Sequence, residues 1–111
     1  MLFRSVLETS LKLPRFETFE EGSQIRKSSK SIKSNIVEGF VRRRYKQEFI
    51  KFLVYALASC DETIYHLDTL FETKSLKDKD KYMYFRDGYD HLGRMINNFI
   101  KAVDLAHKTR I

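Results

Sequence analysis

The sequence holds little of what bends or crosslinks a chain, with four glycines, one proline and one cysteine in 111 residues. Because glycine and proline mark most turns, their scarcity favours a few long helices over many short strands. The single cysteine, Cys60, cannot form a disulfide within the chain or a zinc site made of cysteines alone. Its neighbours follow a helical pattern, so we predict a small core residue rather than a reactive thiol.

Long apolar runs are also absent. No stretch approaches the roughly 18 apolar residues that cross a bilayer, and the N-terminal residues MLFRSVLETS reach charge too soon for a secretory signal. We therefore expect a cytoplasmic protein with no membrane partner. The composition, 42% hydrophobic and 14% aromatic, is too apolar for a disordered chain. At this length we expect one domain that spans residues 1–111.

Signals of catalysis are missing as well. The sequence has no Gly-rich phosphate loop, no cluster of zinc ligands and no motif of a catalytic nucleophile. Glu62 and His66 lie one helical turn apart, as do Asp87 and His91, and we interpret both as surface charge pairs. Metal sites in helical bundles need several inward carboxylates and repeated Glu-x-x-His patterns, which do not occur here. We expect no catalytic residue, no metal and no cofactor, and hence a protein that is not an enzyme.

Hydrophobic periodicity predicts a short first helix and a longer second one. The first spans residues 2–13 and is stopped by Pro14. The second begins near residue 19, because Thr18 and the glutamate three residues later have the spacing of a capping box. It ends where Gly39 can adopt the left-handed conformation of a helix C-terminus. The apolar stripe of this helix is thin, and a serine fills one of its steps.

Two longer helices follow. The third, from about residue 46 to 72, contains neither glycine nor proline. The fourth comes after the polar stretch ETKSLKDKD, in which Ser75 and Asp78 again have capping-box spacing. The apolar positions of the last three helices are Ile25, Ile32, Ile36 and Phe40; Phe49, Phe52, Leu53, Ala56, Cys60, Ile64, Leu67 and Phe71; and Tyr82, Phe85, Tyr89, Leu92, Ile96, Phe99, Val103 and Ala106. The predicted fold is all-α, an up-and-down four-helix bundle with a short first helix.

The predicted helices differ greatly in length. At 1.5 Å per residue the third is about 40 Å long and the first only about 18 Å. One short helix cannot cover the apolar faces of three long ones, and a contiguous exposed apolar patch marks an interface. We therefore expect a homo-oligomer.

Positive charge is concentrated in one segment. Residues 22–51 hold nine basic and two acidic residues, a net charge of +7, whereas the rest of the chain holds twelve basic and thirteen acidic residues. An asymmetry of this kind favours a polyanionic partner, RNA or DNA. The candidate nucleic-acid-binding residues are Arg26, Lys27, Lys30, Lys33, Arg42, Arg43, Arg44 and Lys46.

The basic residues follow a geometric pattern. On a helical wheel Arg26, Lys30 and Lys33 fall within about 60° of one another, beside the apolar stripe, while Lys27 projects elsewhere. Four serines on the same helix have short hydroxyl groups that suit phosphate oxygens: Ser23, Ser28, Ser31 and Ser34. Tyr45 either stacks on a base or packs at a helix end.

Two functions remain open on these residues. The first is a non-enzymatic, oligomeric protein that binds nucleic acid through phosphate contacts, as an accessory to a nucleic-acid enzyme. The alternative is a structural or protein-interaction module, in which the basic segment is a solvated or intersubunit face.

The basic segment also carries a specific pattern of residues. It reads Gln-Ile-Arg-Lys at 24–27, Ser-Ile at 31–32, Asn-Ile at 35–36, Glu-Gly at 38–39, three arginines at 42–44, Glu-Phe at 48–49 and Phe-Leu at 52–53. In this the chain resembles the bacterial four-helix-bundle proteins first noted as open reading frames in intervening sequences of 23S ribosomal RNA genes. The resemblance covers about half of the chain.

The resemblance carries expectations of its own. The accessory variability protein of diversity-generating retroelements is similar to this family, which implies a basic homopentameric barrel that binds nucleic acid and associates with a reverse transcriptase. It implies no catalytic residue. Family members have a longer first helix than residues 2–13 allow. We interpret Asn35, Glu38 and Gly39 as a helix-terminating element, with Asn35 and Glu38 hydrogen-bonded across helices.

Overall fold

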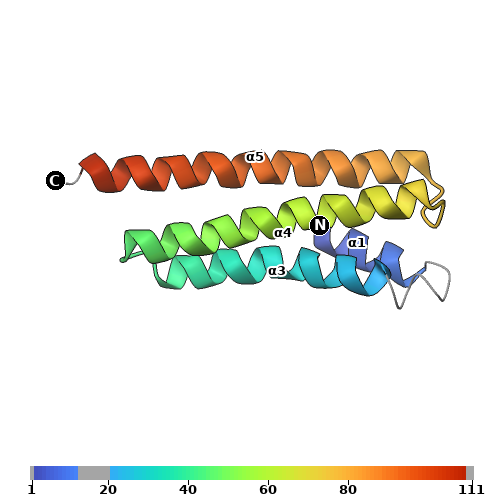
Figure 1. Cartoon of the computed structure of the whole chain (residues 1–111), viewed down its shortest axis with the longest axis horizontal. Coiled ribbons are helices and arrows are strands. Elements are labelled where there is room, and N and C mark those ends of the chain that lie inside the picture. The colour runs from blue at the N-terminus through green and yellow to red at the C-terminus, as the bar shows by residue number, and fades with distance from the viewer. Residues whose placement is uncertain (1, 13–20, 110–111) are drawn as a thin grey trace.

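In the computed structural model four antiparallel helices lie along one another (Figure 1). The structure describes residues 2–12 and 21–109, and within them the helices are α1 (Leu2–Leu11), α3 (Glu21–Val41), α4 (Lys46–Glu72) and α5 (Lys79–Thr109). No strand occurs in these described ranges. The molecule measures 54 × 22 × 20 Å. The predicted all-α, up-and-down four-helix bundle with a short first helix is confirmed.

Helix α1 packs on α3 and α5 near one end of the bundle. Val6, with 2% of its surface exposed, and the buried Ser10 form its inner face. The helix ends at Leu11, two residues before the predicted end. Pro14, the predicted start near residue 19 and the capping box of Thr18 lie outside the described residues.

The predicted end of α3 at Gly39 is wrong. The helix continues to Val41, and no glycine in the described part of the chain has a positive φ. Gly39 is instead buried at the contact with α4, where an added Cβ would lie 3.2 Å from the Cβ of Phe52 and 3.3 Å from the carbonyl oxygen of Phe49. This glycine therefore allows close approach of two helices.

Helix α4 has the predicted bounds. After it, Lys74 adopts a φ of 64° and its N–H donates to the carbonyl of Phe71, as expected for a left-handed residue that ends a helix. The backbone N–H of Lys81 then donates to Oδ1 of Asp78 at 3.1 Å. Asp78 is therefore the N-cap of α5, so this aspartate itself caps the helix instead of serving as the partner of a capping Ser75.

The core falls into two parts. The larger lies where all four helices meet, and its buried residues are Val6, Ile25, Ile32, Ala56, Cys60, Leu67, Leu70, Leu76, Phe85, Tyr89 and Ile96. The smaller consists of Phe49, Leu53 and Val103, between the start of α4 and the end of α5. Only α3, α4 and α5 reach this second end, since α1 stops at the middle of the bundle (Figure 1).

Some predicted core positions are exposed for that reason. Phe40 is 56% exposed and Phe99 is 49% exposed, and Ala106 is exposed as well. All three lie toward the end of the bundle that lacks a fourth helix. The periodicity identified the correct faces of α3 and α5, but burial also requires a neighbour to cover those faces.

Candidate nucleic-acid interface

The basic residues of α3 divide by what they contact. Lys27, Lys30 and Lys33 are exposed, and none of them forms an ion pair with another described residue. Arg26 differs, because its Nη1 donates to Oγ of Ser10 at 3.2 Å and so ties α3 to α1. Of the three cations in the predicted ridge, Lys30 and Lys33 are exposed, whereas Arg26 forms a hydrogen bond that joins two helices.

The connection between α3 and α4 holds the three consecutive arginines. Arg42 pairs with Glu38 one turn earlier, and its guanidinium carbon lies 4.8 Å from the ring centroid of Phe52. Arg43 lies over the ring of Phe40, 4.2 Å from its centroid, and donates to the Phe40 carbonyl at 3.0 Å. Arg44 is exposed and has no ion pair within the described ranges. Arg43 and Arg44 therefore direct charge toward solvent, whereas Arg42 is partly neutralised.

Lys46 does not belong to the outward-facing set. Its Nζ lies 2.7 Å from Oδ1 of Asp104, and the lysine side chain is 23% exposed. The pair joins the start of α4 to α5 across the end of the bundle. Of the eight candidate residues, the structure leaves Lys27, Lys30, Lys33, Arg43 and Arg44 turned to solvent and ties Arg26, Arg42 and Lys46 to other parts of the protein.

Besides a smaller hollow of about 220 Å³ next to Lys33, two grooves adjoin the exposed cations. One, of about 430 Å³, runs beside Lys30, Lys33, Ser34, Val37 and Glu38 on α3. The other, of about 710 Å³, lies at the α3–α4 connection, where Arg43, Arg44 and Tyr45 meet apolar side chains of all three long helices. The first groove lies on α3 and the second lies at the end of the bundle, between the α3–α4 connection and α5, so the candidate interface combines positive charge with concave surface.

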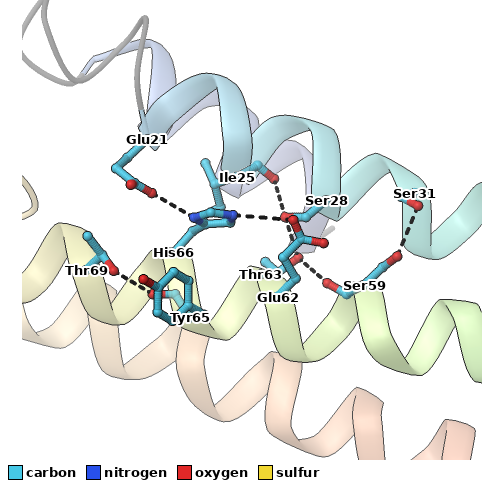
Figure 2. A network of polar contacts seen from close by, with 10 residues as sticks. All are labelled: Glu21, Ile25, Ser28, Ser31, Ser59, Glu62, Thr63, Tyr65, His66 and Thr69. Atoms are coloured by element: carbon cyan, nitrogen blue, oxygen red, sulfur yellow. Dashed lines mark hydrogen bonds and ion pairs between the residues drawn. The ribbon is translucent and has the colours of Figure 1, made fainter.

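The predicted phosphate-binding serines are only partly available. Ser28 Oγ lies 2.9 Å from Thr63 Oγ1, and Ser59 donates to Ser31 at 3.0 Å, so this pair of α3 serines faces α4. Figure 2 shows these contacts as a polar seam between the two helices. Ser23 and Ser34 are exposed and remain able to contact a phosphate. The sequence did not distinguish the two pairs, because serine occurs on both sides of the helix.

His66 is the least expected member of the seam. Its side chain is 10% exposed, with Nδ1 2.7 Å from Glu21 and Nε2 3.6 Å from Glu62 (Figure 2). The interpretation of Glu62 and His66 as a surface pair is therefore wrong for the histidine, which is buried against the first turn of α3. Nε2 has no hydrogen-bond partner among the described residues. Within the described residues no group of three or more His, Cys, Asp or Glu side chains could hold a metal ion.

Asn35 and Glu38 make local contacts rather than the predicted bonds between helices. The amide of Asn35 donates to the carbonyl and the hydroxyl of Ser31, at 2.9 and 3.1 Å. Glu38 pairs with Arg42, which follows the last residue of α3. Both residues therefore support the last turns of α3 and do not form a site.

Cys60 is a core residue, as predicted. It is fully buried and its thiol donates to the carbonyl of Tyr89 at 3.0 Å. Burial, together with the carboxylates of Asp61 and Asp90, raises the pKa of the Cys60 thiol to about 11. Because the thiolate is the nucleophile, this cysteine is inert near neutral pH.

The sequence pattern misplaced Phe40 and left the role of Tyr45 open. Phe40 was assigned to the core, but its exposed ring supports Arg43. Tyr45 had two open interpretations, and the structure leaves its ring 63% exposed at the rim of the larger groove. The signal for both was the short first helix, since the residues at the far end of the bundle have no fourth helix to cover them.

Helix length gives one further result. Among the described residues, no helix combines the length and the apolar character that a membrane span requires.

The fold and the basic face define a helical bundle without a recognisable catalytic centre in the described residues. The model of the family described as 23S rRNA-intervening sequence protein matches residues 1–98. The chain therefore belongs to the 23S rRNA-intervening sequence protein family, and the resemblance drawn from residues 24–53 is confirmed.

A solved structure shows the same fold. The chain is similar to a protein of unknown function from the S23 ribosomal protein family of Bacteroides thetaiotaomicron, with 23% sequence identity and a TM-score of 0.69, over 91% of this chain and 99% of the other. A comparison with curated proteins finds no match.

Proposed function

We propose that this protein is a non-enzymatic, oligomeric nucleic-acid-binding protein that contacts the phosphates of RNA or DNA through α3 and the α3–α4 connection. The observation that carries the proposal is the exposed set of Lys30, Lys33 and Arg44, whose charges no described residue neutralises. Phosphate contacts of this kind give affinity with little base recognition. The partner class that the family resemblance implies is a nucleic-acid enzyme such as a reverse transcriptase.

Charge removal at the proposed interface tests the function. The variant Lys30→Gln, Lys33→Gln, Arg44→Gln should bind duplex DNA and structured RNA more weakly than the parent. Each lost phosphate contact should reduce the slope of log K against log salt by about 0.9 on duplex DNA. Fluorescence anisotropy at several salt concentrations measures both quantities.

A matched control removes the same charge elsewhere. Lys77, Lys79 and Lys81 lie around the start of α5, at the opposite end of the molecule from the α3–α4 connection (Figure 1). All three are exposed, so their replacement should not disturb the core. Replacing them by glutamine removes three positive charges, as many as the test variant loses. Binding should then change little. If both triple variants bind alike, or if the parent shows no salt-sensitive binding, the basic face is not a nucleic-acid interface.

The alternative is a protein-interaction module. It is favoured by the contacts that Arg26, Arg42 and Lys46 make within the protein, since these show that part of the basic segment serves the fold. Under this alternative the remaining cations keep the surface solvated or face another subunit. The charge-removal experiment separates the two functions.

A further inference from the structure

The α3–α4 connection frames a groove in which an apolar floor meets a basic rim. Phe49 and Val103, each 8% exposed, belong to the small second core and line the floor. Arg43, Arg44 and Tyr45 form the rim. The groove has a volume of about 710 Å³ and opens to solvent because α1 does not reach this end of the bundle.

We propose that this groove accepts an unstacked base of a single-stranded nucleic acid, with the base on the apolar floor beside Tyr45 and the adjoining phosphates at Arg43 and Arg44. The proposal rests on the proposed function and names its ligand. A duplex keeps its bases paired and stacked, so only a single strand or a loop can place a base in such a groove.

Tyr45 has the features of a stacking residue. It precedes α4 as the N-cap residue, yet its side chain makes no capping hydrogen bond. The residue is 63% exposed, and its ring pairs with no other aromatic ring in the described chain. A tyrosine that packed at a helix end would be largely covered, so this exposure favours the stacking role. Every base has a flat π-face, and stacking on an aromatic side chain therefore needs no particular base.

The charge at the rim favours a phosphate-bearing ligand. Arg43 is held over Phe40 and bonded to its carbonyl, which fixes the guanidinium before any ligand arrives. Arg44 adds a second charge. The carboxylate nearest in sequence to the floor residue Val103 is Asp104, and it is paired with Lys46 at 2.7 Å. The pair has no net charge, so it does not offset the positive charge of the two arginines at the rim.

A matched pair of tyrosine variants tests the proposal. Tyr45→Ala should weaken binding of a labelled 12-nucleotide single-stranded oligonucleotide about 5- to 140-fold, the cost of losing one base–aromatic stack. Tyr45→Phe should retain the affinity, because it keeps the ring. Tyr65→Ala is the control, since Tyr65 is 65% exposed on α4 but lies outside the groove. Binding of a duplex of the same length should be unchanged in all three variants.

A second measurement reports the base itself. An oligonucleotide that carries 2-aminopurine should show a change of its fluorescence on binding to the parent and to Tyr45→Phe, but not on binding to Tyr45→Ala. Circular dichroism checks that each variant is folded.

The outcomes distinguish the proposal from the function on which it rests. If salt-sensitive binding persists but Tyr45→Ala affects neither strand type, the base-binding groove is wrong and the phosphate-binding function stands. If the parent binds neither strand type, both are wrong. If Tyr45→Ala lowers the mass of the assembly in light scattering, a second copy of the chain covers the groove and the proposal is overturned.

Discussion

At the scale of single residues, buried polar side chains form hydrogen bonds between α3 and α4, at positions where a simple helical bundle would have apolar contacts. Thr63 is fully buried, with Oγ1 2.8 Å from the carbonyl of Ser59 and 2.9 Å from Oγ of Ser28. Its single hydroxyl hydrogen can serve only one of these oxygens, so the seam depends on how neighbouring hydroxyl groups share their hydrogens. Such a buried network is costly when one member is removed.

Thr63→Val provides a test of the seam. Valine keeps the shape of threonine but leaves the buried Ser28 without one partner, so the free energy of unfolding should fall by about 1 to 2 kcal/mol. Thr69→Val is the control, because Thr69 makes the same bond to the carbonyl one turn earlier, at 3.0 Å, near the surface. That variant should remain within about 0.5 kcal/mol of the parent. Urea unfolding at a fixed chain concentration measures both, and equal losses would show that the seam adds nothing.

At the scale of helices, α3 and α4 approach each other closely near the end of α3. Gly39 sits at this contact, where a Cβ would be 3.2 Å from Phe52 Cβ. Gly93 on α5 differs, since a Cβ there would meet Cys60 and Leu57 at ordinary distances of 3.6 and 3.7 Å. Gly39 therefore has a packing role that Gly93 lacks.

Alanine at these two positions should act in opposite directions. Gly93→Ala should raise the free energy of unfolding by about 0.5 to 1 kcal/mol, because alanine is the better helix former. Gly39→Ala gains the same helix propensity but must displace the backbone of α4, and it should lower stability by up to about 2 kcal/mol. Chemical denaturation compares the two, and shifts of equal size and sign would contradict the close approach at Gly39.

The helices show which structural features the sequence can predict. The bounds of α4 were predicted correctly, because its apolar period runs for 27 residues without glycine or proline. The end of α3 was not, because Gly39 fits either a helix end or a close contact, and only the position of α4 decides between them. The periodicity predicts which face of a helix is apolar, but not whether another helix covers that face. Phe40 and Phe99 were therefore assigned to the core, although no fourth helix covers them at their end of the bundle in the described residues.

The contacts of the candidate interface also include some that the sequence predicts and some that it does not. The pair of Glu38 and Arg42 follows from their spacing of four residues. The partners of Arg26 and Lys46 lie 16 and 58 positions away in sequence, Ser10 and Asp104. No local pattern connects such residues, so which cations remain exposed could be learned only from the structure.

At the scale of the whole molecule, the chain exposes more surface than a compact protein of its mass. Its accessible surface is 7665 Å², against about 6,500 Å² expected for a typical monomer of this size. Its radius of gyration is 15.7 Å, against about 13 Å for a compact domain of this length. The elongated bundle thus presents extra surface, and part of it is apolar: Val54, Tyr55, Met83, Tyr84 and Met95 on α4 and α5 are 41% to 59% exposed.

Exposed apolar surface of this extent favours assembly with other copies, which is the oligomeric part of our proposal. Light scattering after gel filtration should give a mass several times the 13.3 kDa of one chain, and the family resemblance favours five copies. Tyr55→Glu combined with Tyr84→Glu should lower that mass, because each change places a charge in the interface. Tyr45→Ala, at the base-binding groove, should leave it unchanged. A parent protein that is monomeric at micromolar concentration would instead mean that α4 and α5 keep these side chains in water, and a ring of phosphate-binding faces could not form.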